Sequence, residues 1–109
     1  MITQILIICV IKIYLNMIVG TCWVKLFLHE NNSLKGKRKV VKSIKDRIRS
    51  KFNVSITEID SHDDWKKIVL GIATVSNDQK FINKVLDNII NSIDSMHLAE
   101  MLDYKIEIL

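Results

Sequence analysis

The sequence has no proline, only three glycines and two cysteines, and aromatic side chains make up 6% of its 109 residues. The lack of proline excludes proline-rich linkers and collagen-like repeats. Cys9 and Cys22 are too few for a multi-disulfide scaffold, and neither belongs to a CxxC pair of the kind that binds zinc. Hydrophobic residues account for 49% and charged residues for 26%, which predicts one globular domain.

Positive charge is concentrated in one segment. The chain has 16 basic and 12 acidic residues, a net charge of +4. Residues 35–51 contain nine basic side chains and a single acid, Asp46, so this segment is +8 and the remainder is −4. Such a segment predicts a surface that attracts polyanions. The alternative is a solvated helix face that only keeps a small domain soluble.

Residues 1–16 are unusually apolar. A secretory signal starts with basic residues, but none precedes Lys12. A membrane-spanning helix needs about 20 apolar residues, and Lys12 and Asn16 interrupt the run before that length. We therefore interpret residues 1–16 as an extension upstream of a native start at Met17. Residues 17–109 would form a cytoplasmic domain with no contact to membranes.

The first half of the domain changes from a period of two to a period of 3.6. Residues 17–28 alternate as a strand does, with Cys22, Val24 and Leu26 on the face opposite Trp23 and Phe27. A helix is predicted from Leu34, capped by Asn32 or Ser33. Its apolar arc contains Val40, Val41, Ile44 and Ile48. The basic side chains on the opposite arc are Lys35, Arg38, Lys39, Lys42, Lys45 and Arg49.

The second half repeats the pattern. Residues 53–59 and 65–76 are predicted strands separated by a charged turn, and the second is apolar on both faces, as a central strand is. A helix follows the capping residues 76–78, and residues 102–108 alternate again. The order β-α-β-β-α-β predicts an α+β, ferredoxin-like fold. We expect a four-stranded antiparallel sheet of order 4-1-3-2 with both helices on one face.

The sheet face away from the helices is expected to be apolar. We assign Trp23, Phe27, Ile68, Leu70 and Ile72 to this outer face. A surface of that kind favours a homodimer or a protein partner. Stacking of RNA bases on it is less favoured, because the second central strand offers aliphatic side chains rather than aromatic ones.

Three stretches resemble the YlxP-like family, a bacterial family of unknown function. They are MIVGTCWVKL, SLKGKRKVVKSIKDRIRSKFNVSITEI and DDWKKIVLGIATVSND, and the similarity extends over residues 17–109. The resemblance implies the ferredoxin-like fold and supplies no activity. The association of the family with genes for transcription and translation factors implies a connection with RNA.

No catalytic or metal site is predicted. Asp60, His62, Asp63 and Asp64 are metal-ligand types, but they crowd one turn without a second cluster to complete a coordination sphere. The histidines have no nucleophile at a recognisable spacing. We therefore expect a protein without a cofactor that binds RNA or a ribosomal particle through the first helix. The alternative is a homodimeric interaction module that uses the outer sheet face.

Overall fold

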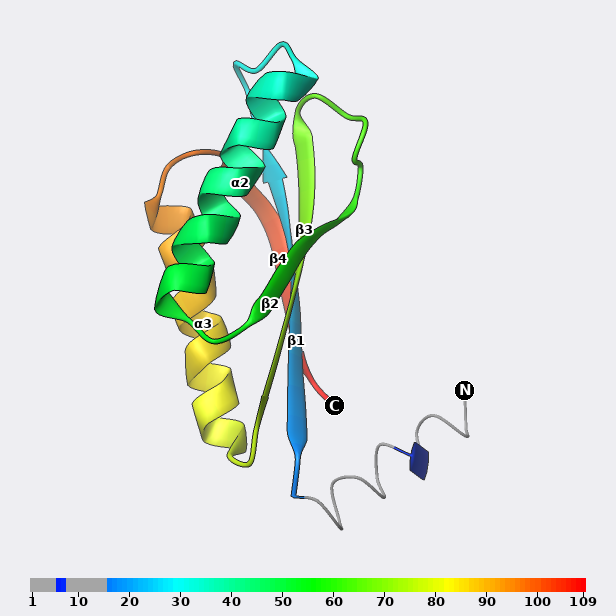
Figure 1. Cartoon of the computed structure of the whole chain (residues 1–109), viewed down its shortest axis with the longest axis vertical. Helices are drawn as coiled ribbons and strands as arrows, with labels where there is room; N and C mark the ends of the chain where they lie inside the picture. The colour runs from blue at the N-terminus through cyan, green and yellow to red at the C-terminus, as the bar shows by residue number, and fades with distance from the viewer. Residues whose placement is uncertain (1–5, 8–15) are drawn as a thin grey trace.

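The computed structural model describes residues 6–7 and 16–109. Residues 16–109 form four strands and two helices in the order β-α-β-β-α-β (Figure 1). Their bounds are β1 Ile18–Phe27, α2 Leu34–Lys51, β2 Ser55–Asp60, β3 Lys67–Ser76, α3 Gln79–Ser95 and β4 Glu100–Ile108.

The interpretation of residues 1–16 as an upstream extension falls outside the described residues, apart from Leu6, Ile7 and Asn16. It therefore stays a prediction. Within the described part of the chain, neither helix has the length and apolar character needed to cross a bilayer.

The strands form one antiparallel sheet of order β2-β3-β1-β4, and both helices cover the same face of it (Figure 1). The predicted ferredoxin-like fold and its order 4-1-3-2 are confirmed, since this is the same order read from the other edge. The central strands are β1 and β3. The strand β1 pairs with β3 over ten residues and with β4 on its other side.

Each helix begins at a side-chain cap. The Oγ of Ser33 accepts a hydrogen bond from the backbone N–H of Gly36 at 3.0 Å. Asp78 does the same for α3, since its Oδ1 accepts from the N–H groups of Lys80 and Phe81. These bonds satisfy N–H groups that have no partner inside the helix, and they fix where each helix starts.

The core lies between the helices and the sheet. Even-numbered residues of β1 point inward, as their alternation predicts, and meet the apolar arcs of both helices. Gly20 allows an especially close approach, because a Cβ at this position would collide with Ile82. Side chains that are 1% exposed or less include Val24, Leu26, Ile44, Ile48, Ile56, Ile68, Leu70, Ile82, Leu86 and Ile89.

The prediction that Ile68, Leu70 and Ile72 lie on the outer face is wrong. The register pairs Trp23 of β1 with Gly71 of β3, so the odd-numbered residues of β3 share the outer face and the even-numbered ones point to the helices. Ile68, Leu70 and Ile72 are accordingly buried in the core. The β3 sequence is apolar on both faces, so its alternation could not show which set faces inward.

Truncation of a side chain should destabilise the protein more on the inner face of β3 than on its outer face. We expect Leu70→Ala to lower the free energy of unfolding by about 3 kcal/mol, because it leaves a cavity in the core. Val75→Ala should cost less than about 1 kcal/mol, since Val75 is 62% exposed whereas Leu70 is fully buried. Urea unfolding monitored by circular dichroism measures both values. Equal losses would contradict the assignment of the faces.

Candidate nucleic-acid interface

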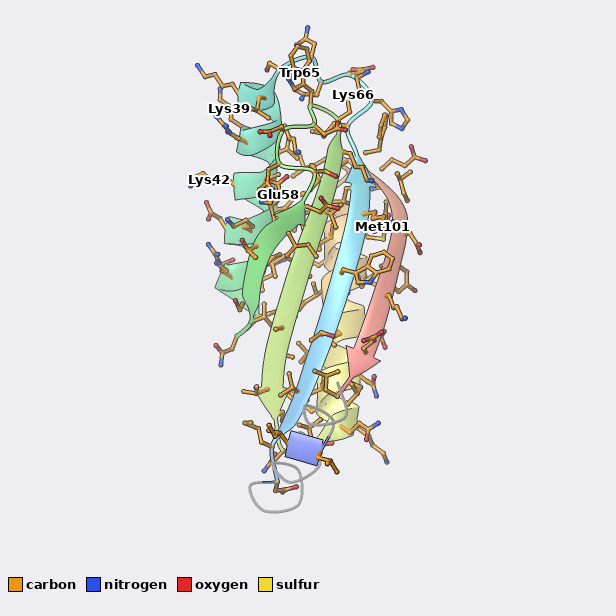
Figure 2. All side chains as sticks on the ribbon, turned by 90° about the vertical axis from the view of Figure 1, so that its right-hand side faces the viewer. Lys39, Lys42, Glu58, Trp65, Lys66 and Met101 are labelled. Carbon is orange, nitrogen blue, oxygen red and sulfur yellow. The ribbon has the colours of Figure 1, made fainter. Side chains whose placement is uncertain are left out.

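The six cations predicted on the first helix lie along one side of α2, and we call this set the cationic face. Five of them are exposed and the sixth, Lys45, is partly exposed. Figure 2 shows Lys39 and Lys42 extending from α2 away from the sheet. Successive turns of a helix are about 5.4 Å apart, so these charges repeat at a spacing that suits the phosphates of an extended strand. The members are Lys35, Arg38, Lys39, Lys42, Lys45 and Arg49.

Two members of the cationic face have partners on the protein. The Nζ of Lys42 lies 2.7 Å from a carboxylate oxygen of Asp46 one turn away. That hydrogen bond, with the charges of the nearby cations, lowers the pKa of Asp46, so this carboxylate stays ionised at neutral pH. Arg49 donates from Nη2 to the carbonyl oxygen of Ile56 at 2.9 Å. The other four cations form no ion pair with any residue in the described ranges.

A seventh basic residue of α2, Lys37, is buried, with 1% of its side chain exposed. Its Nζ donates to the carbonyl oxygen of Ser61 at 2.5 Å and lies 3.0 Å from Oε2 of Glu58, whose side chain is 16% exposed. The second contact is an ion pair without hydrogen-bond geometry, since Oε2 has no hydrogen-bond partner among the described residues. Glu58 lies on the inner face of β2, opposite the core residue Leu70.

Sequence analysis missed this ion pair. The signal is the position of Lys37 on the apolar arc of α2, four residues before Val41 and seven before Ile44. A lysine at such a position must either reach solvent or find a buried partner. The partner, Glu58, comes from β2, and only the fold brings the two together.

The loop between β2 and β3, residues 61–66, is fixed to the start of α2 at several points. Lys37 holds the carbonyl of Ser61, as described above. The Nδ2 of Asn31 donates to the carbonyl oxygens of Trp65 and Ser33, at 2.5 and 2.7 Å. Asn31 reaches these groups because Gly36 has no side chain, and a Cβ there would collide with its Oδ1. Trp65 itself is left 54% exposed.

The acidic residues of this loop shape the turn. The Oδ1 of Asp64 accepts from the backbone N–H groups of Lys66 and Lys67 at 2.8 and 2.9 Å, which lowers the pKa of Asp64. Asp60 accepts from the N–H of Ser61, and His62 contacts the carbonyl of Glu58. Within the described ranges, no group of three or more His, Cys, Asp or Glu side chains is arranged to hold a metal ion.

The outer sheet face has a shallow apolar groove of about 350 Å³ over β1, β2 and β3. Gly71 and Ala73 of β3 leave room for the groove, because glycine has no side chain and that of alanine is a single methyl group. Ile59, the extra residue of a bulge in β2, lies over Gly71, and Trp23 borders the groove from β1. None of the described residues that line the groove is charged. They are Thr21, Cys22, Trp23, Ser55, Thr57, Ile59, Gly71, Ile72 and Ala73.

Two of the predicted outer-face residues, Trp23 and Phe27, do lie on this face and are partly exposed. The Nζ of Lys25 lies 5.2 Å from the ring centre of Trp23, within range of a cation–π contact. The role of this face as an interface stays a prediction.

The histidines are divided between two places. His29 and His97 line a cleft of about 400 Å³ at the end of the sheet, where the ring of His29 contacts the carboxylate of Glu100. His62 lies in the β2–β3 loop. Among the described residues that line the cleft, none is a serine or a cysteine.

The thiol of Cys22 is a poor nucleophile. Burial, followed by the charge of Asp87, raises the pKa of Cys22 to about 11, so this thiol is protonated at neutral pH.

Comparison with known proteins identifies relatives without an assigned function. A family model described as protein of unknown function, DUF503, matches residues 19–106. The uncharacterised protein YlxP of Bacillus subtilis (strain 168) is 39% identical over 77 residues, which make up 71% of this chain and 84% of the relative.

Solved structures support the fold alone. The de novo designed protein Foldit4 aligns with a TM-score of 0.52 at 10% identity, covering 85% of this chain and 96% of the designed one. SnoaB, a cofactor-independent oxygenase from Streptomyces nogalater, aligns with a TM-score of 0.47 at 10% identity. The alignment covers 84% of this chain and 90% of SnoaB. A likeness at 10% identity supports the topology, and a topology does not specify a function.

Removal of the Lys37 ammonium should destabilise the fold. We expect Lys37→Ala to lower the free energy of unfolding by about 3 kcal/mol, because Glu58 is left with an unpaired and largely buried charge. Replacing both residues by methionine should recover most of the loss. Urea unfolding measures the change, and Lys39→Ala, an exposed lysine of the same helix, is the control. A loss no larger for Lys37→Ala than for Lys39→Ala would contradict the buried ion pair.

Proposed function

The chain belongs to the DUF503 family of proteins of unknown function, and we propose that it binds RNA or an RNA-containing particle such as the ribosome through the cationic face of α2. The observation that carries the proposal is the row of cations on a rigid helix, five of which have no acidic partner among the described residues. A role in RNA binding would be carried out in the cytoplasm and would need no catalysis.

The geometry favours binding to phosphates over reading of sequence. Lysine and arginine on one helix face neutralise several phosphates at once and release their counterions, which supplies affinity for any polyanion. Sequence discrimination requires contacts with base edges, which a helix lying along the phosphates does not make. We therefore expect binding that depends strongly on salt and weakly on sequence.

A second candidate function is supported by the outer sheet face. Val75 and Ile59 are 62% and 51% exposed there, next to the uncharged groove. We propose that a second copy of this chain binds to the outer sheet face. A two-fold contact places the same patch against itself, and an uncharged patch does so without repulsion between like charges. The α2 helices lie on the other side of the sheet, so a dimer would leave both cationic faces free.

Binding to single-stranded RNA should weaken steeply with salt. Four to six neutralised phosphates predict a slope of log K against log[salt] between about −3 and −4. Charge reversal of Lys35, Arg38 and Lys39 to glutamate should weaken binding and reduce the slope by about 2. Lys35 lies in the first turn of α2, where an acidic residue interacts favourably with the helix dipole, and Arg38 and Lys39 are exposed. Fluorescence anisotropy with a labelled 12-nucleotide RNA measures both quantities.

The matched control reverses three exposed lysines away from α2, namely Lys80, Lys84 and Lys105. It changes the net charge by the same amount and should keep most of the affinity and the slope. Equal losses in the two triple variants would show that net charge, and not the cationic face, is responsible. A flat salt response in the wild-type protein would overturn the proposed function.

The dimer should be visible by sedimentation equilibrium at protein concentrations of about 0.1–1 mM. Val75→Asp should shift the protein to a monomer, because a carboxylate would be buried at the contact without a partner. The control is Phe81→Asp, which adds a carboxylate at an exposed apolar position on α3. A monomeric wild-type protein over this range would rule out the second candidate.

A further inference from the structure

Trp65 lies in the loop between β2 and β3, and 54% of the residue's surface is exposed. Single exposed aromatic residues are common on protein surfaces, so exposure alone indicates nothing. Two further features distinguish Trp65, namely the way its backbone is held and the charges beside it.

The backbone of Trp65 is fixed relative to α2. Its carbonyl oxygen accepts from Nδ2 of Asn31, which also bonds to the carbonyl of Ser33, the capping residue of α2. The next residue, Lys66, donates from Nζ to the carbonyl of His29 at 3.3 Å. The loop is therefore bonded to the segment that leads into α2 both at Trp65 and at the residue after it.

The indole lies at the end of the molecule where α2 and its row of cations begin. Figure 2 shows Trp65 at the end of the sheet where α2 begins, with Lys39 in the nearby part of the helix. Lys35, one turn before Lys39, is also exposed. Asp63 and Asp64, the two residues before Trp65 in the loop, carry negative charge. A phosphate chain is therefore favoured along α2 and disfavoured across the loop tip.

We infer that Trp65 is a stacking site for an unpaired base of an RNA strand whose phosphates lie along the cationic face. The inference rests on the proposed function and names its ligand class, since it requires single-stranded or looped RNA. Bases in a duplex are already stacked and have no free face to offer, whereas an unpaired base can turn toward an aromatic ring. The cations supply most of the affinity, and Trp65 adds a preference for nucleobases over other polyanions.

The test uses the full chain with Trp23→Phe, so that Trp65 is the only tryptophan. Two probes are compared: a 12-nucleotide oligouridylate and an inorganic polyphosphate of similar charge, which has no bases. We expect the RNA to quench Trp65 fluorescence over the same concentration range in which it binds, and the polyphosphate to bind without comparable quenching.

In the same background, Trp65→Leu should weaken binding of the oligouridylate by roughly 5- to 100-fold and leave polyphosphate binding unchanged. Trp65→Tyr, which keeps an aromatic face, should recover much of the loss. Phe81→Leu removes an exposed aromatic ring from α3 and is the control.

The possible failures are distinguishable. Unchanged RNA affinity in Trp65→Leu, with the Lys35, Arg38 and Lys39 reversal still harmful, would overturn the stacking site and leave the proposed function intact. Absence of RNA binding by the wild-type chain at low salt would overturn both. Tighter binding to a duplex of the same length than to the single strand would overturn the inferred ligand class.

Discussion

Burial of one arc of α2 against the sheet determines what the rest of the surface can do. Val41, Ile44 and Ile48 are removed from water between α2 and the sheet, and each such side chain contributes about 1.5–3 kcal/mol of hydrophobic free energy. A helix is rigid, so fixing this arc also fixes the direction and spacing of the cations on the opposite arc. The cationic face is therefore a consequence of core packing, and its charges do not have to be organised by a ligand.

The exception on the buried arc, Lys37, has a different effect. A buried ion pair rarely adds net stability over an apolar pair of the same volume, because both charges lose their hydration. Its consequence here is positional. The ammonium of Lys37 contacts Glu58 on β2 and the carbonyl of Ser61. These contacts fix the position of the β2–β3 loop relative to α2. Asn31 adds a second connection at Trp65.

Local patterns predicted the elements well, and long-range contacts explain what they missed. The alternation of β1, the cap at Ser33 and the 3.6-residue period of α2 depend on neighbouring residues, and all three agree with the structure. The face of β3 depends on its register with β1, which an apolar run on both sides does not encode. The partner of Lys37 and the bond from Asn31 to Trp65 join residues 21 and 34 positions apart, so no local pattern contains them.

The position of β1 at the centre of the sheet has a consequence for how the chain folds. Of the described strands, β1 comes first and pairs with β4, which comes last, and the backbone N–H of Leu109 donates to the carbonyl of Val19. Contacts between segments far apart in the sequence form slowly, because a long loop must close first. During synthesis, the edge of β1 that pairs with β4 therefore stays open until Glu100–Ile108 has left the ribosome. A nascent chain that stops before Glu100 presents this open edge to other chains, which makes the completion of β4 the step that protects the protein from aggregation.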